Sequence, residues 1–153
     1  MIRFEILNTG NRDIAAEFYK KMIDESRQAD SRLAEYKTDD KSIGNLLAYS
    51  LDTEDNLFYL AFMHSEPIGF IDSTRIVQEN GKESWYIKSV YLLEQYRTSW
   101  YFDMLLKKLE GTVRQKGIRT IFNTSLMDDP RANELWSAAG YTIEQNRRVK
   151  ELS

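Results

Sequence analysis

The sequence predicts an α/β (α+β) domain whose sheet has about six strands, three of them consecutive and antiparallel. Strand and helix patterns follow one another in the order strand, two helices, three strands, helix, strand, helix, strand. Asn80-Gly81, between two β-rich runs, is the strongest short-range hairpin signal. The run from Leu57 to Met63 is apolar on both faces, which is typical of a central strand. With 153 residues, 42% hydrophobic and 29% charged, the chain is expected to be a single domain, residues 1–153.

The first fifty residues predict one strand and two helices. Residues 2–7 form a short strand that the turn formers "NTGN" close. Ile14, Phe18 and Met22 recur every four residues and make an apolar stripe on the first helix. The segment "KSIGNLLAYSL" predicts the second helix, although Gly44 costs it about 1 kcal/mol.

The rest of the chain alternates strands with helices. Two strands surround the turn "SEPIG", and the Asn80-Gly81 hairpin leads into a third, "WYIKSVYLL". The stretch "YRTSWYFDMLLKKLE" lies where this strand turns into a helix, and a further strand follows in "GIRTIFNTSL". In "DDPRANELWSAAG", Asp129 is the expected N-cap of a further helix and Gly140 its C-terminal cap. A last strand begins at "YTIEQ".

Composition excludes several kinds of chemistry. The chain has no cysteine, which excludes disulfides, a thiolate nucleophile and cysteine metal sites. Its single histidine, His64, makes a zinc site unfavourable, so no metal is expected. A net charge of -3 argues against nucleic acid as a partner and favours a cationic one. No signal-peptide pattern and no run of about 20 apolar residues is present, so we expect a cytoplasmic protein without a membrane partner.

Three segments carry a resemblance to a known family. They are "EPIGFI", then "VYLLEQYR" followed by "DMLLKKLE", then "RANELWSAAGY". In this order they resemble the GCN5-related N-acetyltransferase (GNAT) family. The resemblance implies a GNAT-like mixed, mainly antiparallel sheet, splayed near its middle, with helices on both faces. It also implies transfer of an acetyl group from acetyl-CoA to a primary amine of a small molecule or protein. Because no covalent nucleophile is visible in the sequence, we expect direct attack in a ternary complex.

The family's pyrophosphate loop is degenerate in this chain. The loop reads Gln or Arg, two residues, Gly, one residue, then Gly or Ala; Arg97 matches, but Trp100 and Phe102 replace the small residues. The chemistry needs backbone N–H groups at a helix N-terminus rather than particular side chains. Phe102 fits the core-facing row of its helix, and Asn123 either contacts the cofactor or satisfies an edge strand. The resemblance implies cofactor contacts from a strand end, the loop and two later side chains: Tyr91, Leu92, Leu93, Arg97, Thr98, Ser99, Trp100, Tyr101, Phe102, Asn123 and Trp136.

Candidate catalytic residues also follow from the resemblance. Trp136 occupies the place of the family's usual tyrosine, and an indole N–H cannot protonate a thiolate. Tyr141 is therefore the candidate acid, with Tyr91 or water as alternatives. Glu83 is the candidate base, although a glutamate beside a turn is more often solvated. Asp72, if it faces the cleft, could bind a cationic acceptor.

A second function stays open beside the enzyme. The chain could be a non-catalytic GNAT-fold binding module that has lost acetyl-CoA binding. Exposed Trp100 and Tyr101 rings on the cleft side would favour that module, and buried rings would favour the enzyme. The acidic patches "TDD" and "DTED" either are solvated or attract a cationic amine acceptor. Exposed aromatic residues near the late strands could also form a homodimer interface.

Overall fold

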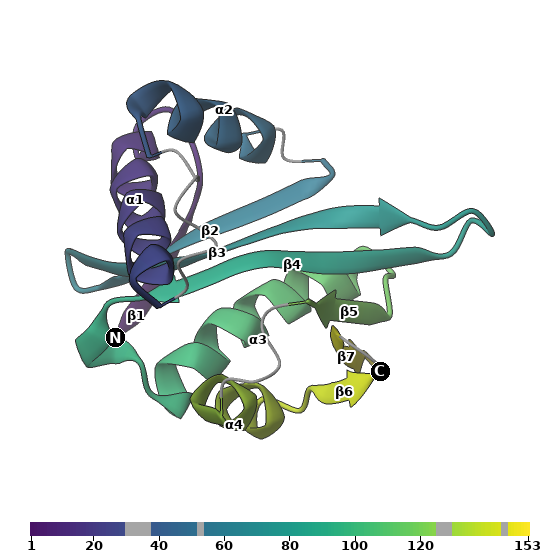
Figure 1. Cartoon of the computed structure of the whole chain (residues 1–153). Coiled ribbons are helices and arrows are strands. Elements are labelled where there is room, and N and C mark those ends of the chain that lie inside the picture. Colours follow the sequence, from purple (N-terminus) through teal and green to yellow (C-terminus); the bar gives the residue numbers. More distant parts are fainter. Residues whose placement is uncertain (30–37, 52–53, 125–129, 145–146) are drawn as a thin grey trace.

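The computed structural model describes residues 1–29, 38–51, 54–124, 130–144 and 147–153. Within these ranges a seven-stranded sheet has the order β1-β2-β3-β4-β5-β7-β6 (Figure 1). The strands are β1 (Ile2–Ile6), β2 (Asn56–Met63), β3 (Glu66–Val77), β4 (Glu83–Leu92), β5 (Thr120–Asn123), β6 (Thr142–Glu144) and β7 (Arg147–Glu151). The helices are α1 (Arg12–Ala29), α2 (Asp40–Ser50), α3 (Ser99–Gln115) and α4 (Pro130–Ala138), with a 3-10 turn at Glu94–Tyr96. Asp129, the expected N-cap, lies outside the described residues.

The sheet is mixed and mainly antiparallel, as the sequence predicted. Strands β1 to β4 pair antiparallel in succession, and β7 pairs antiparallel with both β5 and β6. In the part of the chain that the structure describes, the one parallel pair joins β4 to β5. One strand exceeds the six expected: β7, whose sequence "RRVKE" is too charged to be recognised as an inner strand.

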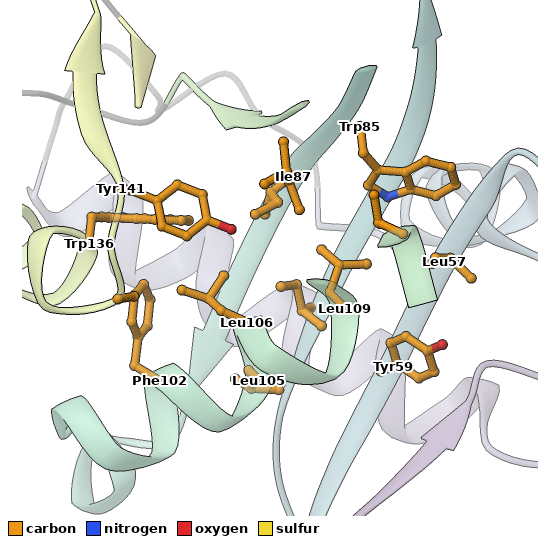
Figure 2. Packing of buried hydrophobic residues seen from close by; sticks show 14 of the residues in the cluster. Leu57, Tyr59, Trp85, Ile87, Phe102, Leu105, Leu106, Leu109, Trp136 and Tyr141 are labelled. Carbon is orange, nitrogen blue, oxygen red and sulfur yellow. The ribbon is translucent and has the colours of Figure 1, made fainter. Parts of the chain in front are cut away.

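Helices cover both faces of the sheet, which confirms that expectation. Helices α1 and α2 lie on one face and α3 and α4 on the other (Figure 1). Each face has its own apolar core. On the α3 face, leucines of the helix pack against β2 and β4 (Figure 2), and the labelled members are Leu57, Tyr59, Trp85, Ile87, Phe102, Leu105, Leu106, Leu109, Trp136 and Tyr141.

Local signals account for several element ends. Asp39 caps α2 by accepting a hydrogen bond from the backbone N–H of Ser42 (3.2 Å). Gly140 ends α4 with φ 89°, donating to the carbonyl of Ser137, while Tyr141 donates to that of Trp136. This pair of bonds is a Schellman motif, so the predicted C-terminal cap is confirmed.

The helices of the described residues are short or polar. None of these helices combines the length and the apolar character needed to cross a bilayer.

Candidate functional site

Strands β4 and β5 part after a short stretch of pairing. Among the described residues, the pairing joins Trp85 with Ile121 and Tyr86 with Phe122 and goes no further, although β4 continues to Leu92. We call the point of separation, at Ile87 and Asn123, the fork. There the side-chain amide of Asn123 donates to the carbonyl of Ile87 (3.1 Å). The amide therefore satisfies the edge of β4 from within the protein, and a contact between Asn123 and the cofactor stays a prediction.

Lys88 forms a β-bulge immediately beyond the fork. Asp72 of β3 lies opposite Ser89, and Ser73 lies opposite Ile87, so Lys88 has no opposite residue. A bulge bends its strand and redirects the side chains beside it. The bulge therefore lies where β4 separates from β5.

The free edge of β4 follows from its hydrogen bonding to β3. Leu93 donates its N–H to the carbonyl of Ile68 (2.9 Å). Since antiparallel pairing alternates, the backbone groups of Leu92 and Val90 face away from β3, into the gap that β5 leaves. The carbonyl of Leu92 indeed accepts a bond from Arg97 Nε (2.6 Å) on that side. The sequence predicted cofactor contacts from Tyr91, Leu92 and Leu93. The N–H of Leu93 is already bonded to Ile68, whereas the N–H of Leu92 is directed into the gap.

Helix α3 begins at the open end of this gap with unsatisfied donors. Thr98 has extended backbone but makes no side-chain cap bond, and the first intrahelical bond runs from Phe102 N–H to Thr98 C=O (3.1 Å). Ser99, Trp100 and Tyr101 therefore have no intrahelical acceptor for their N–H groups. No hydrogen bond within the described parts of the chain engages them either. Such a helix end attracts anions, because the helix dipole adds positive charge to the free N–H groups.

The bulky loop residues leave this helix end intact. Phe102 lies in the core with its ring edge-on to Trp136 (5.0 Å), as its helical spacing predicted. Trp100 is 54% exposed, and its ring packs edge-on against that of Tyr101, with 4.8 Å between the ring centroids. The Tyr101 ring in turn packs edge-on against that of Tyr96, with 5.0 Å between the centroids. Positive φ angles at non-glycine positions occur, among the described residues, at His64 alone. The loop therefore needs no glycine for its backbone conformation.

Arg97 binds within the protein instead of remaining free for a phosphate. Its Nη2 contacts Glu25 of α1 (2.6 Å), and its guanidinium lies over the ring of Tyr91 (5.2 Å). Tyr91 also donates its hydroxyl to Glu25 (3.1 Å). Burial, and then the neighbouring Glu25, raise the pKa of Tyr91 to about 12. These contacts join the second half of α1 to the end of β4.

The two predicted catalytic residues lie away from the fork. Tyr141 is 3% exposed and donates its hydroxyl to buried Glu110 (3.0 Å), in the core on the α3 face (Figure 2). Burial and the Glu110 carboxylate raise its pKa well above the ordinary tyrosine value. Glu83 is the first residue of β4, at the opposite end from Leu92, and forms an ion pair with Arg75 (2.6 Å). Their catalytic roles stay predictions, and neither side chain is among those gathered at the fork.

A buried polar cluster beside the bulge is the feature that sequence reasoning missed in part. Asp72 is 1% exposed, and it accepts hydrogen bonds from Tyr19 (2.5 Å) and Ser50 (3.1 Å). The ammonium of Lys88 lies 3.4 Å from the same carboxylate. Burial raises the pKa of Asp72, and the charge of Lys88 opposes that shift. The one available signal for Lys88 was a lysine inside the otherwise apolar run "WYIKSVYLL".

The acidic patches are partly accounted for by ion pairs. Asp40 binds Lys20 (2.6 Å) at a groove of about 530 Å³ between α1 and α2. Asp55 binds Arg75 (2.9 Å), and residues 52–53 lie outside the described ranges. In the described parts, these carboxylates therefore neutralise nearby cations of the protein itself.

Comparison with solved structures shows the same fold in acetyltransferases. The PaiA N-acetyltransferase of Thermoplasma acidophilum in complex with coenzyme A matches with a TM-score of 0.77 and 18% identity, over 100% of this chain and 99% of that one. AAC(6')-Iy in complex with the bisubstrate analogue CoA-S-monomethyl-acetylneamine matches with a TM-score of 0.76 and 12% identity, over 95% and 92%. An aminoglycoside acetyltransferase from an uncultured soil metagenomic sample in complex with sisomicin matches with a TM-score of 0.72 and 15% identity, over 94% and 90%.

Comparison by sequence identifies the family. A search of curated proteins found no match. The family model described as "Acetyltransferase (GNAT) family" matches residues 13–141, which include the fork, the bulge and the start of α3. The chain therefore belongs to the GNAT family of acetyltransferases.

Proposed function

We propose that this protein transfers an acetyl group from acetyl-CoA to a primary amine of a small molecule or protein. One observation carries the proposal: the gap between β4 and β5 runs from the unsatisfied N-terminus of α3 to the fork. Acetyl-CoA is elongated, with a pyrophosphate toward one end and a reactive thioester at the other. Its shape therefore matches a site with free N–H groups at the start of α3 and a free strand edge along β4.

The donor's pyrophosphate would bind the N–H groups of Ser99, Trp100 and Tyr101. The amide-rich pantetheine arm would pair with the free edge of β4 at Leu92 and Val90, as an added strand does. Four residue steps separate Leu92 from Lys88, a span of about 13 Å at the usual rise of a strand. The arm would therefore bring its thioester to the fork.

Chemistry at the fork would be direct attack by the acceptor amine. No cysteine is present to form an acyl-enzyme. Holding donor and acceptor together supplies much of the rate in such reactions. The acceptor that we propose is a cationic amine, in keeping with the net charge of -3 and with the aminoglycoside acetyltransferase among the structural matches.

Exposure of Trp100 favours a second candidate function. Its half-exposed ring beside Tyr101 offers a stacking surface that an acetyltransferase does not need. A non-catalytic module could use that surface for another ligand. Tyr101 is only partly exposed and packs against the core on the α3 face. The exposed ring of Trp100 thus favours the binding module, whereas the packed ring of Tyr101 favours the enzyme.

Calorimetric titration separates the two functions. Purified protein is titrated with acetyl-CoA, with desulfo-CoA and ATP as controls. Micromolar binding of acetyl-CoA and desulfo-CoA supports the acetyltransferase, and amine acceptors are then screened by CoA release. A folded protein that binds neither at millimolar concentration would refute it and favour the binding module.

A further inference from the structure

Lys88 occupies a particular place relative to the proposed donor. It is the first residue of β4 beyond the fork and the extra residue of the bulge. The gap closes at the bond between Asn123 and Ile87, so a donor arm that enters at α3 cannot extend further. The reactive end of that arm would thus stop beside Lys88.

Asp72 and Lys88 form an ion pair whose two side chains differ in exposure to solvent. Asp72 is almost fully buried, whereas the side chain of Lys88 is 29% exposed. Lys88 is therefore the member of this pair whose side chain a ligand can reach. Tyr19 and Ser50 donate to Asp72 from α1 and α2, so this carboxylate is held on three sides. In a buried position of this kind a fixed charge pair acts more strongly than it would in water.

The ammonium of Lys88 retains donor capacity. A lysine carries three N–H donors. The contact with Asp72 uses one of these N–H donors, and no other acceptor within the described ranges binds the ammonium. Accessible N–H groups on a held cation can serve an oxygen or a sulfur that gains negative charge.

We infer that Lys88 is a catalytic residue whose ammonium stabilises the negative charge that develops on the thioester and on the departing sulfur. The inference rests on the proposed acetyl-CoA function and adds a residue to it. The acceptor nitrogen forms the new C–N bond with its lone pair, the C–S bond breaks, and its electron pair leaves on sulfur as a thiolate. The proton that the amine loses passes to solvent, and Lys88 keeps its own proton throughout.

Asp72 acts in this scheme as a positioning residue. Its carboxylate holds the ammonium beside the bulge of β4, next to an apolar core. Tyr19 and Ser50 fix the carboxylate, so the pair has one orientation. The same ammonium would also disfavour a protonated amine next to it and favour the neutral, nucleophilic form.

Binding of the product CoA tests this without any acceptor. A free thiol has a pKa near 8.5 and is mostly protonated at neutral pH. An ammonium beside the sulfur should favour the bound thiolate, which absorbs in the ultraviolet and which desulfo-CoA cannot form. We expect wild-type protein at neutral pH to bind CoA roughly tenfold more tightly than desulfo-CoA, since charge-assisted hydrogen bonds are the strong ones.

Substitutions assign the effect to Lys88. Lys88→Met should reduce the affinity ratio to about one and abolish the thiolate absorbance, while desulfo-CoA affinity stays within about twofold. Lys88→Arg should keep much of both signals. Lys82→Met, which removes an exposed lysine from the β3–β4 hairpin, is the matched control and should match wild type. Asp72→Asn should lower the ratio without changing desulfo-CoA affinity.

The outcomes separate the two levels of the proposal. A wild-type ratio near one, or an unchanged ratio in Lys88→Met, overturns the role of Lys88 while leaving the donor site in place. Absence of desulfo-CoA binding to folded wild-type protein overturns the proposed function and this inference with it. If Lys88→Met does not fold because Asp72 loses its counter-charge, the double variant Asp72→Asn/Lys88→Met removes both charges and must give the same low ratio.

Discussion

The side-chain amide of Asn123 donates to the carbonyl of Ile87 across 3.1 Å, where β4 and β5 part. The same side chain accepts a bond from Arg148 of β7 (3.3 Å), so one residue links three strands. A strand that parts from its neighbour exposes unpaired backbone groups. The Asn123 side chain satisfies the first such group of β4, the carbonyl of Ile87, at the point where pairing with β5 stops.

Replacing Asn123 should therefore weaken the whole fold. Asn123→Leu leaves the buried Ile87 carbonyl without this donor, at an expected cost of about 1–3 kcal/mol in the free energy of unfolding. Urea denaturation measures the loss. Asn45→Leu, at an exposed position of α2, serves as the control. Equal midpoints for Asn123→Leu and wild type would show that the bond does not hold the fork.

The open N–H groups of α3 can be tested one donor at a time. Ser99→Pro removes the N–H of the first helical residue, and the extended backbone of Thr98 already suits a following proline. Ser99→Ala keeps that N–H and removes only the hydroxyl. We expect Ser99→Pro to weaken acetyl-CoA binding about tenfold, consistent with a lost hydrogen bond to a charged group. If both variants bind acetyl-CoA equally well in calorimetry, the pyrophosphate does not use this N–H.

Gly69 permits a close approach of β3 to β4. A Cβ at this position would lie 2.1 Å from the carbonyl oxygen of Tyr91, so Gly69→Ala must displace the strand that lines the gap. We expect a loss of at least about 2 kcal/mol, in the range of severe backbone and packing changes. Gly111→Ala in α3 meets nothing within 4 Å and should instead stabilise the protein by about 0.5–1 kcal/mol. Thermal unfolding of the two variants should move in opposite directions.

Tyr141 should prove structural. Tyr141→Phe removes a buried donor to Glu110, and a loss of about 1 kcal/mol in stability is expected. Its rate of acetyl transfer should remain near that of wild type once an acceptor is known. Tyr49→Phe, at an exposed site on α2, controls for the lost hydroxyl. A fall of about a hundredfold in rate, with stability unchanged, would restore Tyr141 as the acid.

The raised pKa of Tyr91 should appear as an alkaline loss of stability. The folded state holds this proton up to a pKa of about 12, whereas the unfolded chain releases it near 10.0. Stability from this group is thus complete below pH 10 and falls as the pH rises toward 12. The free energy of unfolding of wild type should decrease relative to that of Tyr91→Phe across this window. Parallel curves for the two proteins would contradict the shift.

Much of the fold could be predicted because its signals are local. The stripe of Ile14, Phe18 and Met22, the Asn80-Gly81 turn and the cap at Gly140 depend on neighbouring residues, and each gave the observed element. Phe102 was placed correctly by its spacing within α3.

Long-range contacts hid the remaining features. Strand β7 has an unfavourable composition, yet Arg148 is buried because Asn123 and Asn133 accept its hydrogen bonds and its guanidinium lies 5.6 Å from the ring of Trp136. The pairing of Lys88 with Asp72 likewise depends on a bulge between two strands, which no local pattern encodes.

The position of β7 has a consequence for how the protein is made. The strand of residues 147–151 inserts between β5 and β6, and its Arg148 contacts Asn123 at the fork. During synthesis the ribosome releases this strand after every other element of the sheet. Strands β2, β3 and β4 can therefore assemble as successive hairpins on the nascent chain, with β1 added at the edge of β2. By contrast, β5 acquires its second neighbour, and Asn123 its arginine, only after residue 151 has emerged.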